Sequence, residues 1–206
     1  MPSFKVTLPG LENNFDTLIN SFIDNKVGIS NNFLSSDLAI HLKENLVAHY
    51  ADSRLRTAGT GNDTAVLHNR DFRSDIIYWL DRKHTNPYEI AFFTLMDEFV
   101  HYLNSTCYTG ITGYEFHYTL YEKDSFYHKH RDQFRNNESR QFSMVMYLNA
   151  DWEQGDGGEL CIHHADHLQM ISPMNRKTVF FKSSELEHEV LLTHLPRMSI
   201  TGWLRK

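Results

Sequence analysis

The sequence has few cysteines and no long apolar run. Its two cysteines, Cys107 and Cys161, form neither a metal-binding motif nor a disulfide framework, which favours a reducing, cytoplasmic environment. No apolar segment is long enough to span a membrane. The first residues, Met1 to Lys5, lack the apolar core of a signal peptide. We therefore expect no membrane partner.

Positive charge is also scarce. The chain has 20 Lys and Arg residues against 26 Asp and Glu residues, and a net charge of −6. This balance argues against nucleic acid as a partner. The hydrophobic fraction of 41% is ample for a core, and 206 residues suit one domain with a small extension. We expect residues 1–30 to be an N-terminal extension and residues 31–206 to form a single domain.

Helical periodicity is confined to the first half of the chain. Apolar spacing predicts a short amphipathic helix over Phe15–Ile23 in an otherwise irregular segment. A second helix should begin after an N-cap at Ser35 or Ser36 and end near Tyr50. Its buried stripe should consist of Leu38, Leu42, Leu46 and Val47.

The longest helix should begin at Asn86-Pro87 and end near Ser105, because proline favours the first helical position. Its apolar residues surround it nearly completely, Ile90 among them, so it should pack against a sheet. Before it, the second half of Asn69–Leu80 reads as a strand.

From Gly113 onward the period changes to that of strands. Eight short strands with turn-rich breaks and no intervening helix predict a double-sheet jelly roll or barrel. Helices first and strands afterwards predict a mainly β fold with the N-terminal helices on one face. The expected strands are Tyr114–Glu122, Phe126–Phe134, Gln141–Asn149, Glu159–His163, Leu168–Ile171, Thr178–Lys182, His188–Leu192 and Arg197–Leu204.

A His-x-Asp pair, His130 and Asp132, lies in the second of these strands. Residues two apart in a strand point to the same face, so the imidazole and the carboxylate should converge. Non-haem Fe(II) oxygenases hold their metal with two histidines and one carboxylate. The chain has 13 histidines, so the pair alone leaves open a surface histidine beside a solvated aspartate.

Arg197 begins the last expected strand and shares a face with Thr201 by alternation. An arginine inside a barrel needs an anionic partner, because burying an unpaired charge is very unfavourable. A carboxylate-bearing co-substrate would suit the guanidinium, which binds carboxylates through two hydrogen bonds. A surface position and a structural salt bridge remain open for Arg197.

Together these motifs resemble the 2-oxoglutarate/Fe(II)-dependent dioxygenase superfamily, whose fold is a double-stranded β-helix. The prolyl-hydroxylase clade is most similar, with its HIF prolyl hydroxylases and the bacterial relatives that act on elongation factor Tu. The resemblance covers roughly Asn31 to Lys206. The matching motifs are Arg73-x-Asp75-x-x-x-Trp79, His130-x-Asp132, Tyr147-Leu148-Asn149, Gly157-Gly158-Glu159-Leu160, His188-Glu189-Val190 and Arg197-x-x-x-Thr201-x-Trp203.

The resemblance implies a role for each matching residue. Iron ligands would be His130, Asp132 and His188, and Arg197 would pair with the distal carboxylate of 2-oxoglutarate. Three further residues would line the co-substrate pocket: Tyr147 as a hydrogen-bond donor, Thr201 as a polar neighbour, and Tyr121, which lies one residue closer to the iron motif than the family spacing. Substrate binding would fall to Arg73, Asp75 and Trp79, beside a mobile finger within Ala51–Asp75 that contains Gly59 to Thr64.

The implied activity is that of a peptidyl-prolyl 4-hydroxylase. It would use Fe(II), 2-oxoglutarate and O2, with ascorbate as a further cofactor, and release succinate and CO2. Its partner would be a protein or peptide that contains the target proline. Nucleic-acid demethylases of the AlkB type carry a second arginine where this chain has Trp203, and collagen-type hydroxylases have lysine at the position of Arg197. A hydroxylase of a free amino acid or small metabolite, and a non-catalytic sensor that binds metal or a 2-oxo acid, remain as alternatives.

Overall fold

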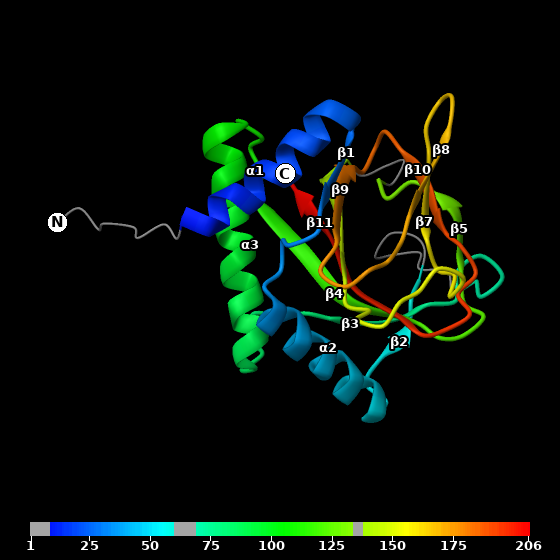
Figure 1. The fold of residues 1–206 in the computed structure, drawn as a ribbon. Coiled ribbons are helices and arrows are strands. Elements are labelled where there is room, and N and C mark those ends of the chain that lie inside the picture. The colour runs from blue at the N-terminus through cyan, green and yellow to red at the C-terminus, as the bar shows by residue number, and fades with distance from the viewer. Residues whose placement is uncertain (1–8, 60–68, 134–137) are drawn as a thin grey trace.

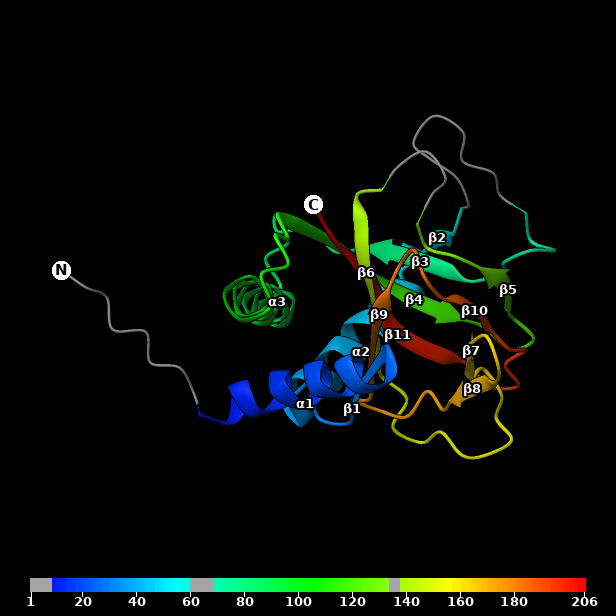
Figure 2. The same cartoon turned by 90° about the horizontal axis from the view of Figure 1, so that it is seen from above.

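The computed structural model describes residues 9–59, 69–133 and 138–206. Its strands form two antiparallel sheets that face each other, and three helices cover the outer face of the larger sheet (Figures 1 and 2). The predicted mainly β jelly roll, with its helices on one face, is confirmed. Residues 60–68 of the expected finger and Phe134 lie outside the described residues.

The three helices are α1 (Pro9–Asn25), α2 (Ser36–Ala51) and α3 (Pro87–Thr106), close to where the sequence places them. Ser35 caps α2 by accepting a hydrogen bond from the amide of Leu38, and Asn86 caps α3. The expected stripe of α2 is wrong at one position, because the side chain of Val47 is 47% exposed. Ile90 of α3 is likewise 50% exposed, so one side of that helix faces water.

The larger sheet has the strand order β1-β9-β6-β11-β4-β3-β2. The sequence did not predict β1 and β2, which have four and two residues and lie among helices and irregular segments. The bounds are β1 (Val27–Ser30), β2 (Arg56–Thr57), β3 (Ile76–Trp79), β4 (Gly113–Tyr121), β6 (Arg140–Tyr147), β9 (Thr178–Lys182) and β11 (Arg197–Arg205).

The smaller sheet has the order β5-β10-β7-β8, and three of its strands match the predicted ranges within two residues. The bounds are β5 (Tyr127–His130), β7 (Leu160–His163), β8 (Leu168–Ile171) and β10 (Glu187–Val190). The strand expected over Phe126–Phe134 is shorter, since β5 ends at His130.

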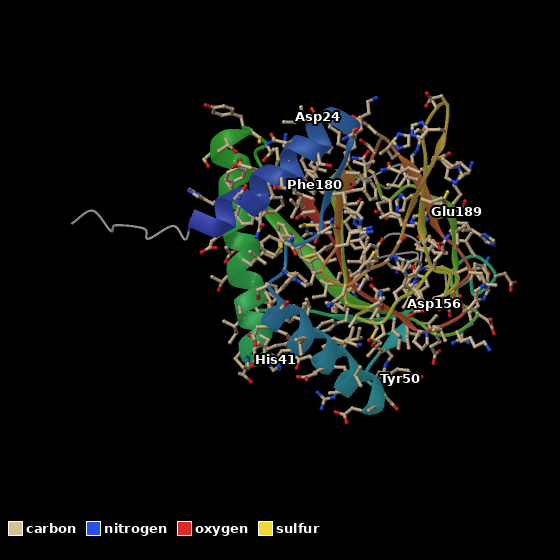
Figure 3. All side chains as sticks on the ribbon, viewed as in Figure 1. Asp24, His41, Tyr50, Asp156, Phe180 and Glu189 are labelled. Atoms are coloured by element: carbon tan, nitrogen blue, oxygen red, sulfur yellow. The ribbon has the colours of Figure 1, made fainter. Side chains whose placement is uncertain are left out.

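Two apolar cores follow from these layers. The first lies between the helices and the larger sheet, where Phe180 of β9 packs against Phe22 of α1 and Phe99 of α3 (Figure 3). The second fills the space between the sheets, and Tyr147, Leu160 and Phe181 belong to it. Alternate residues of β6 enter alternate cores, as the sequence predicts.

The N-terminal segment takes part in both layers. Phe15 and Leu18 of α1 are buried in the helical core, and β1 pairs with β9 from Val27↔Phe181 to Ser30↔Thr178. The division predicted at residue 30 thus falls directly after a strand of the larger sheet and stays a prediction of domain organisation. Among the described residues, no helix combines the length and the apolar character needed to cross a membrane.

Candidate active site

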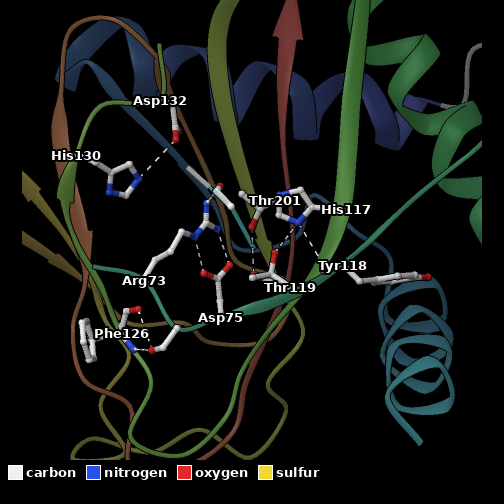
Figure 4. Close-up of polar contacts among 12 residues, drawn as sticks. Arg73, Asp75, His117, Tyr118, Thr119, Phe126, His130, Asp132 and Thr201 are labelled. Atoms are coloured by element: carbon white, nitrogen blue, oxygen red, sulfur yellow. Dashed lines mark hydrogen bonds and ion pairs between the residues drawn. The ribbon is translucent and has the colours of Figure 1, made fainter. Parts of the chain in front are cut away.

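Two histidines and one aspartate converge between the sheets. His130 is the last residue of β5, and the ladder pairs it with His188 of β10. Nε2 of His130 lies 3.6 Å from Oδ1 of Asp132 (Figure 4). Nε2 of His188 lies 3.5 Å from Oδ2 of the same carboxylate. The three ligand atoms lie within 4.8 Å of one another, so the group can hold one metal ion.

Asp132 does not lie in the same strand as His130, contrary to the prediction. Alternation within one strand was expected to bring it beside His130, but β5 has already ended there. The chain bends after His130, and the amide of Gln133 donates to the carbonyl of Ser183 instead of continuing the ladder with β10. The bend turns the Asp132 carboxylate back toward the two imidazoles.

Backbone contacts orient both imidazoles for metal binding. Nδ1 of His130 lies 2.7 Å from the carbonyl oxygen of His128, and Nδ1 of His188 lies 3.4 Å from that of Leu186. A proton on Nδ1 that is donated to a carbonyl leaves the lone pair of Nε2 available to a metal. Both Nε2 atoms are those that face Asp132.

The electrostatics favour a neutral His188 and an ionised Asp132. Burial, with a contribution from the nearby His130, lowers the pKa of His188 to about 4, so His188 is neutral at physiological pH. Burial alone would raise the pKa of Asp132, but His188 and His130 outweigh it and hold that pKa well below its ordinary value. Two neutral imidazoles and one carboxylate are the donor set that non-haem Fe(II) prefers, so the residues present fit iron.

Arg197 lies between two tyrosines of the core that separates the sheets. It is 3% exposed, and its guanidinium carbon is 4.9 Å from the ring centroids of both Tyr121 and Tyr147. Its Nε donates to the carbonyl of Gly158 over 2.8 Å, yet no carboxylate among the described residues pairs with the guanidinium. A buried cation in this position calls for an anionic ligand.

The tyrosines supply neutral hydroxyls beside that cation. The buried hydroxyl of Tyr147 makes no hydrogen bond of normal geometry to a described residue. Burial raises the pKa of Tyr147, and Arg197 offsets part of this effect. Burial, followed by Asp75, raises the pKa of Tyr121 as well, so both phenols keep their protons and can donate. A guanidinium without a carboxylate partner, beside a buried phenol, fits a ligand carboxylate.

The backbone conformation beside Arg197 requires glycine at positions 157 and 158. Both residues have positive φ, 72° and 75°, a conformation that favours glycine. A Cβ atom on Gly158 would lie 2.9 Å from Cδ of Arg197, and one on Gly157 would lie 2.2 Å from the carbonyl oxygen of Leu192. The turn therefore lets its backbone approach the arginine closely enough to accept its hydrogen bond.

Arg73 and Asp75 form a salt bridge with each other. Nε and Nη2 of Arg73 donate to the two carboxylate oxygens of Asp75 over 2.8 and 2.6 Å (Figure 4). The carboxylate is completely buried. The guanidinium carbon of Arg73 also lies 4.2 Å from the ring centroid of Tyr127. The ring of Tyr127 stacks on the imidazole of His130, with 3.5 Å between the ring centroids.

Sequence analysis did not assign a role to Tyr127, although it begins the motif strand three residues before His130. Its position between Arg73 and His130 orients an imidazole of the triad. The remaining predicted residues, Thr201 and Trp79, lie on β11 and β3 of the larger sheet. Thr201 shares a face with Arg197 and lies 3.2 Å from the hydroxyl of Ser199, while Trp79 is 46% exposed beside Trp203 and His117.

Comparison with known proteins agrees with this geometry. Residues 116–205 match the family described as the 2OG-Fe(II) oxygenase superfamily. A prolyl-4-hydroxylase from Pseudomonas putida superposes with a TM-score of 0.85 and 28% identity, over 93% of this chain and 99% of that one. A prolyl hydroxylase from Trichoplax adhaerens, in complex with a peptide fragment of the hypoxia-inducible factor oxygen degradation domain, gives 0.83 and 22%, over 98% and 94%.

A third similar structure, a prolyl 4-hydroxylase from Phytophthora capsici, gives a TM-score of 0.77 and 18% identity, over 99% of this chain and 67% of that one. The fold and the site define a 2-oxoglutarate/Fe(II)-dependent dioxygenase. Residues 116–205 carry the sequence pattern of that superfamily, as the motifs predict, and the chain is similar to solved structures of the prolyl-hydroxylase clade. Its cofactors are accordingly Fe(II), 2-oxoglutarate and O2, whereas ascorbate stays a prediction.

Proposed function

We propose that the protein hydroxylates a prolyl residue in a protein or peptide, with release of succinate and CO2. The proposal is carried by the convergence of His130, Asp132 and His188 in one structure with a buried Arg197 that no described carboxylate neutralises. The Pseudomonas putida prolyl-4-hydroxylase supports the substrate class, because its similarity extends over nearly the whole of both chains.

In this proposal the triad holds the iron, and iron with its co-substrates supplies the oxidising chemistry. The chain fixes the ligand geometry before the metal arrives. The carbonyls of His128 and Leu186 set both imidazole tautomers, and Tyr127 supports the ring of His130 from one side. Apolar side chains such as Phe181, 4.8 Å from the ring of His188, exclude water from the same site.

Arg197 holds 2-oxoglutarate by its distal carboxylate in this proposal. A planar guanidinium binds a carboxylate through two parallel hydrogen bonds, and the hydroxyl of Tyr147 adds a third. Tyr121 lies on the opposite side of Arg197 and Thr201 farther along the same face, so both complete the polar lining of the pocket.

The substrate would approach the site near Trp79. This tryptophan is exposed at the end of β3, and its ring lies 4.9 Å from His117 and 6.4 Å from Trp203. Aromatic faces of this kind suit a proline ring in an extended peptide. Arg73 and Asp75 contribute by holding the residues before β3 against β5, since Ser74 exchanges hydrogen bonds with Phe126.

Succinate release tests the proposal directly. The protein is incubated with Fe(II), 2-oxoglutarate and a library of proline-containing peptides, and each peptide is examined for a mass gain of one oxygen. We expect peptide-dependent succinate and an oxidised proline with the wild type, and neither with Asp132→Ala. Free proline and free amino acids serve as the comparison. Turnover with these and with no peptide would contradict a protein substrate.

A further inference from the structure

A second cluster of metal-ligand side chains lies on the outer face of the smaller sheet. Cys161 and His163 of β7 lie next to Glu189 of β10, and the ladder places Cys161 directly opposite Glu189. Nε2 of His163 is 2.8 Å from Oε1 of Glu189 and 4.0 Å from Sγ of Cys161. All three ligand atoms lie within 4.8 Å of one another.

This outer cluster shares no residue with the iron site. His188 and Glu189 are neighbours on β10, and successive side chains of a strand point to opposite faces. His188 therefore faces the space between the sheets, whereas Glu189 faces away from it. Figure 3 shows Glu189 on the side of the molecule that is remote from the three helices.

We propose that Cys161, His163 and Glu189 form a second metal site, for Zn²⁺ or a cation of similar preference. A thiolate, an imidazole and a carboxylate are the three ligand types that Zn²⁺ accepts. Ligand atoms about 2.0–2.3 Å from a tetrahedral ion lie about 3–4 Å from one another. The observed 2.8 and 4.0 Å bracket that spacing, so small rotations of the side chains suffice.

Burial divides the cluster into an anchored side and an open side. Cys161 is 3% exposed, while the side chains of His163 and Glu189 are 24% and 25% exposed. A cation can therefore enter from solvent and keep a water molecule as its fourth ligand. On binding, the Cys161 thiol transfers its proton to solvent, and the sulfur forms the bond to the metal.

The other histidines of the β7–β8 hairpin have partners of their own. Nε2 of His164 lies 2.9 Å from Oε1 of Gln169, and Nδ1 of His167 lies 2.8 Å from Oδ1 of Asp166. They therefore leave the ligand set at three residues. Since these three come from two strands, a bound cation would fasten β7 to β10 directly behind the iron ligand His188.

Cobalt(II) distinguishes the two sites by its spectrum, because a thiolate bound to Co²⁺ absorbs strongly in the near ultraviolet and the iron site contains no sulfur. The metal-free, reduced full chain is titrated with Co²⁺ alone. We expect a charge-transfer band that saturates at one equivalent, and a total of two bound ions by equilibrium dialysis. The double variant His130→Ala/Asp132→Ala should keep the band.

The matched controls are the two cysteines. Cys161→Ser should abolish the band and leave one bound ion, whereas Cys107→Ser, at the other free cysteine, should keep it. The His163 side chain is partly exposed, so the variant His163→Gln should fold normally, which circular dichroism checks. This variant should bind Co²⁺ at least tenfold more weakly. No band in the wild type, or a band that survives Cys161→Ser, would overturn the proposal. Neither result depends on the hydroxylase reaction.

Discussion

At the scale of single residues, Arg197 should separate co-substrate binding from metal binding. Arg197→Ala removes a buried charge-assisted pair with the ligand, a loss of about 2–5 kcal/mol. We expect the affinity for 2-oxoglutarate to fall about thirtyfold or more, because each 1.4 kcal/mol is about tenfold. Calorimetric titration with 2-oxoglutarate and Mn²⁺ measures this effect.

Two variants control for that experiment. Tyr147→Phe should weaken 2-oxoglutarate in the same direction by less, because it removes a single hydrogen bond. Arg205→Ala removes a charge from the same strand, but Arg205 pairs with Glu115 at the far end of β11, so binding should not change. If Arg197→Ala weakened Mn²⁺ itself as strongly as 2-oxoglutarate, the assignment of Arg197 to the co-substrate would fail.

The buried His117 should make the free energy of unfolding depend on pH. Burial, with a contribution from Arg73, lowers the pKa of His117 to about 4, whereas an unfolded histidine titrates near its model value of 6.5. The unfolded chain therefore binds more protons between these values, so the free energy of unfolding should fall as the pH drops from about 6.5 to about 4. The loss should reach about 2–3 kcal/mol, at about 1.4 kcal/mol for each pKa unit.

Urea denaturation at pH 7 and pH 4.5 tests that expectation, with the metal removed. His117→Gln cannot gain the proton, so the difference between the two pH values should shrink by about 2 kcal/mol in this variant. The comparison within each protein removes any constant loss from the substitution. An unchanged difference would show that His117 is not the titrating group.

At the scale of elements, the contact between α1 and β1 depends on a glycine. A Cβ atom on Gly28 would lie 2.5 Å from the carbonyl oxygen of Leu18 and 3.1 Å from Cβ of Phe22. Gly28→Ala should therefore push α1 away from the sheet and destabilise the fold by about 1–3 kcal/mol, as overpacking does. Gly113→Ala is the matched control, because a Cβ there meets nothing within 4 Å. Equal urea midpoints for the two variants would contradict this packing.

The Arg73–Asp75 pair links the residues before β3 to β5. Removing one partner leaves the other charge buried without compensation, which destabilises proteins by about 3–5 kcal/mol. Arg73→Ala should therefore unfold at much lower urea concentration than the wild type. The double variant Arg73→Ala/Asp75→Ala should lose less than the sum of the single losses, because it leaves no orphaned charge. Additive losses would mean that the pair is not coupled.

At the scale of the whole molecule, the site joins the two sheets. The triad lies on the side of the smaller sheet, and Arg197 and Tyr147 belong to the larger one. A ligand that binds only the folded state at 100 times its Kd adds about 2.7 kcal/mol. Mn²⁺ with 2-oxoglutarate should raise Tm by about 5–10 °C at that saturation, since 1 kcal/mol shifts a chain of this size by about 2–4 °C. His188→Ala should abolish the shift, which scanning calorimetry measures.

The sequence predicted the fold class and most element positions because long periodic segments such as α3 and β4 carry their own pattern. It could not predict β1 and β2, whose partners lie far away along the chain. Motif order singled out the three residues whose ligand atoms meet, and the buried Arg197, while their roles stay predictions. The stacking of Tyr127 on His130 and the meeting of Cys161 with Glu189 depend on strand register, which spacing along the sequence does not reveal.

The position of β11 also bears on how the chain acquires this structure. In the larger sheet β11 lies between β6 and β4, both of which precede it in the sequence (Figure 2). A ribosome therefore exposes β4 and β6 before the strand that joins them exists. Their edges must stay unpaired, or covered by a chaperone, until β11 inserts with Arg197. Non-local pairing of this kind folds slowly and leaves the nascent chain open to aggregation.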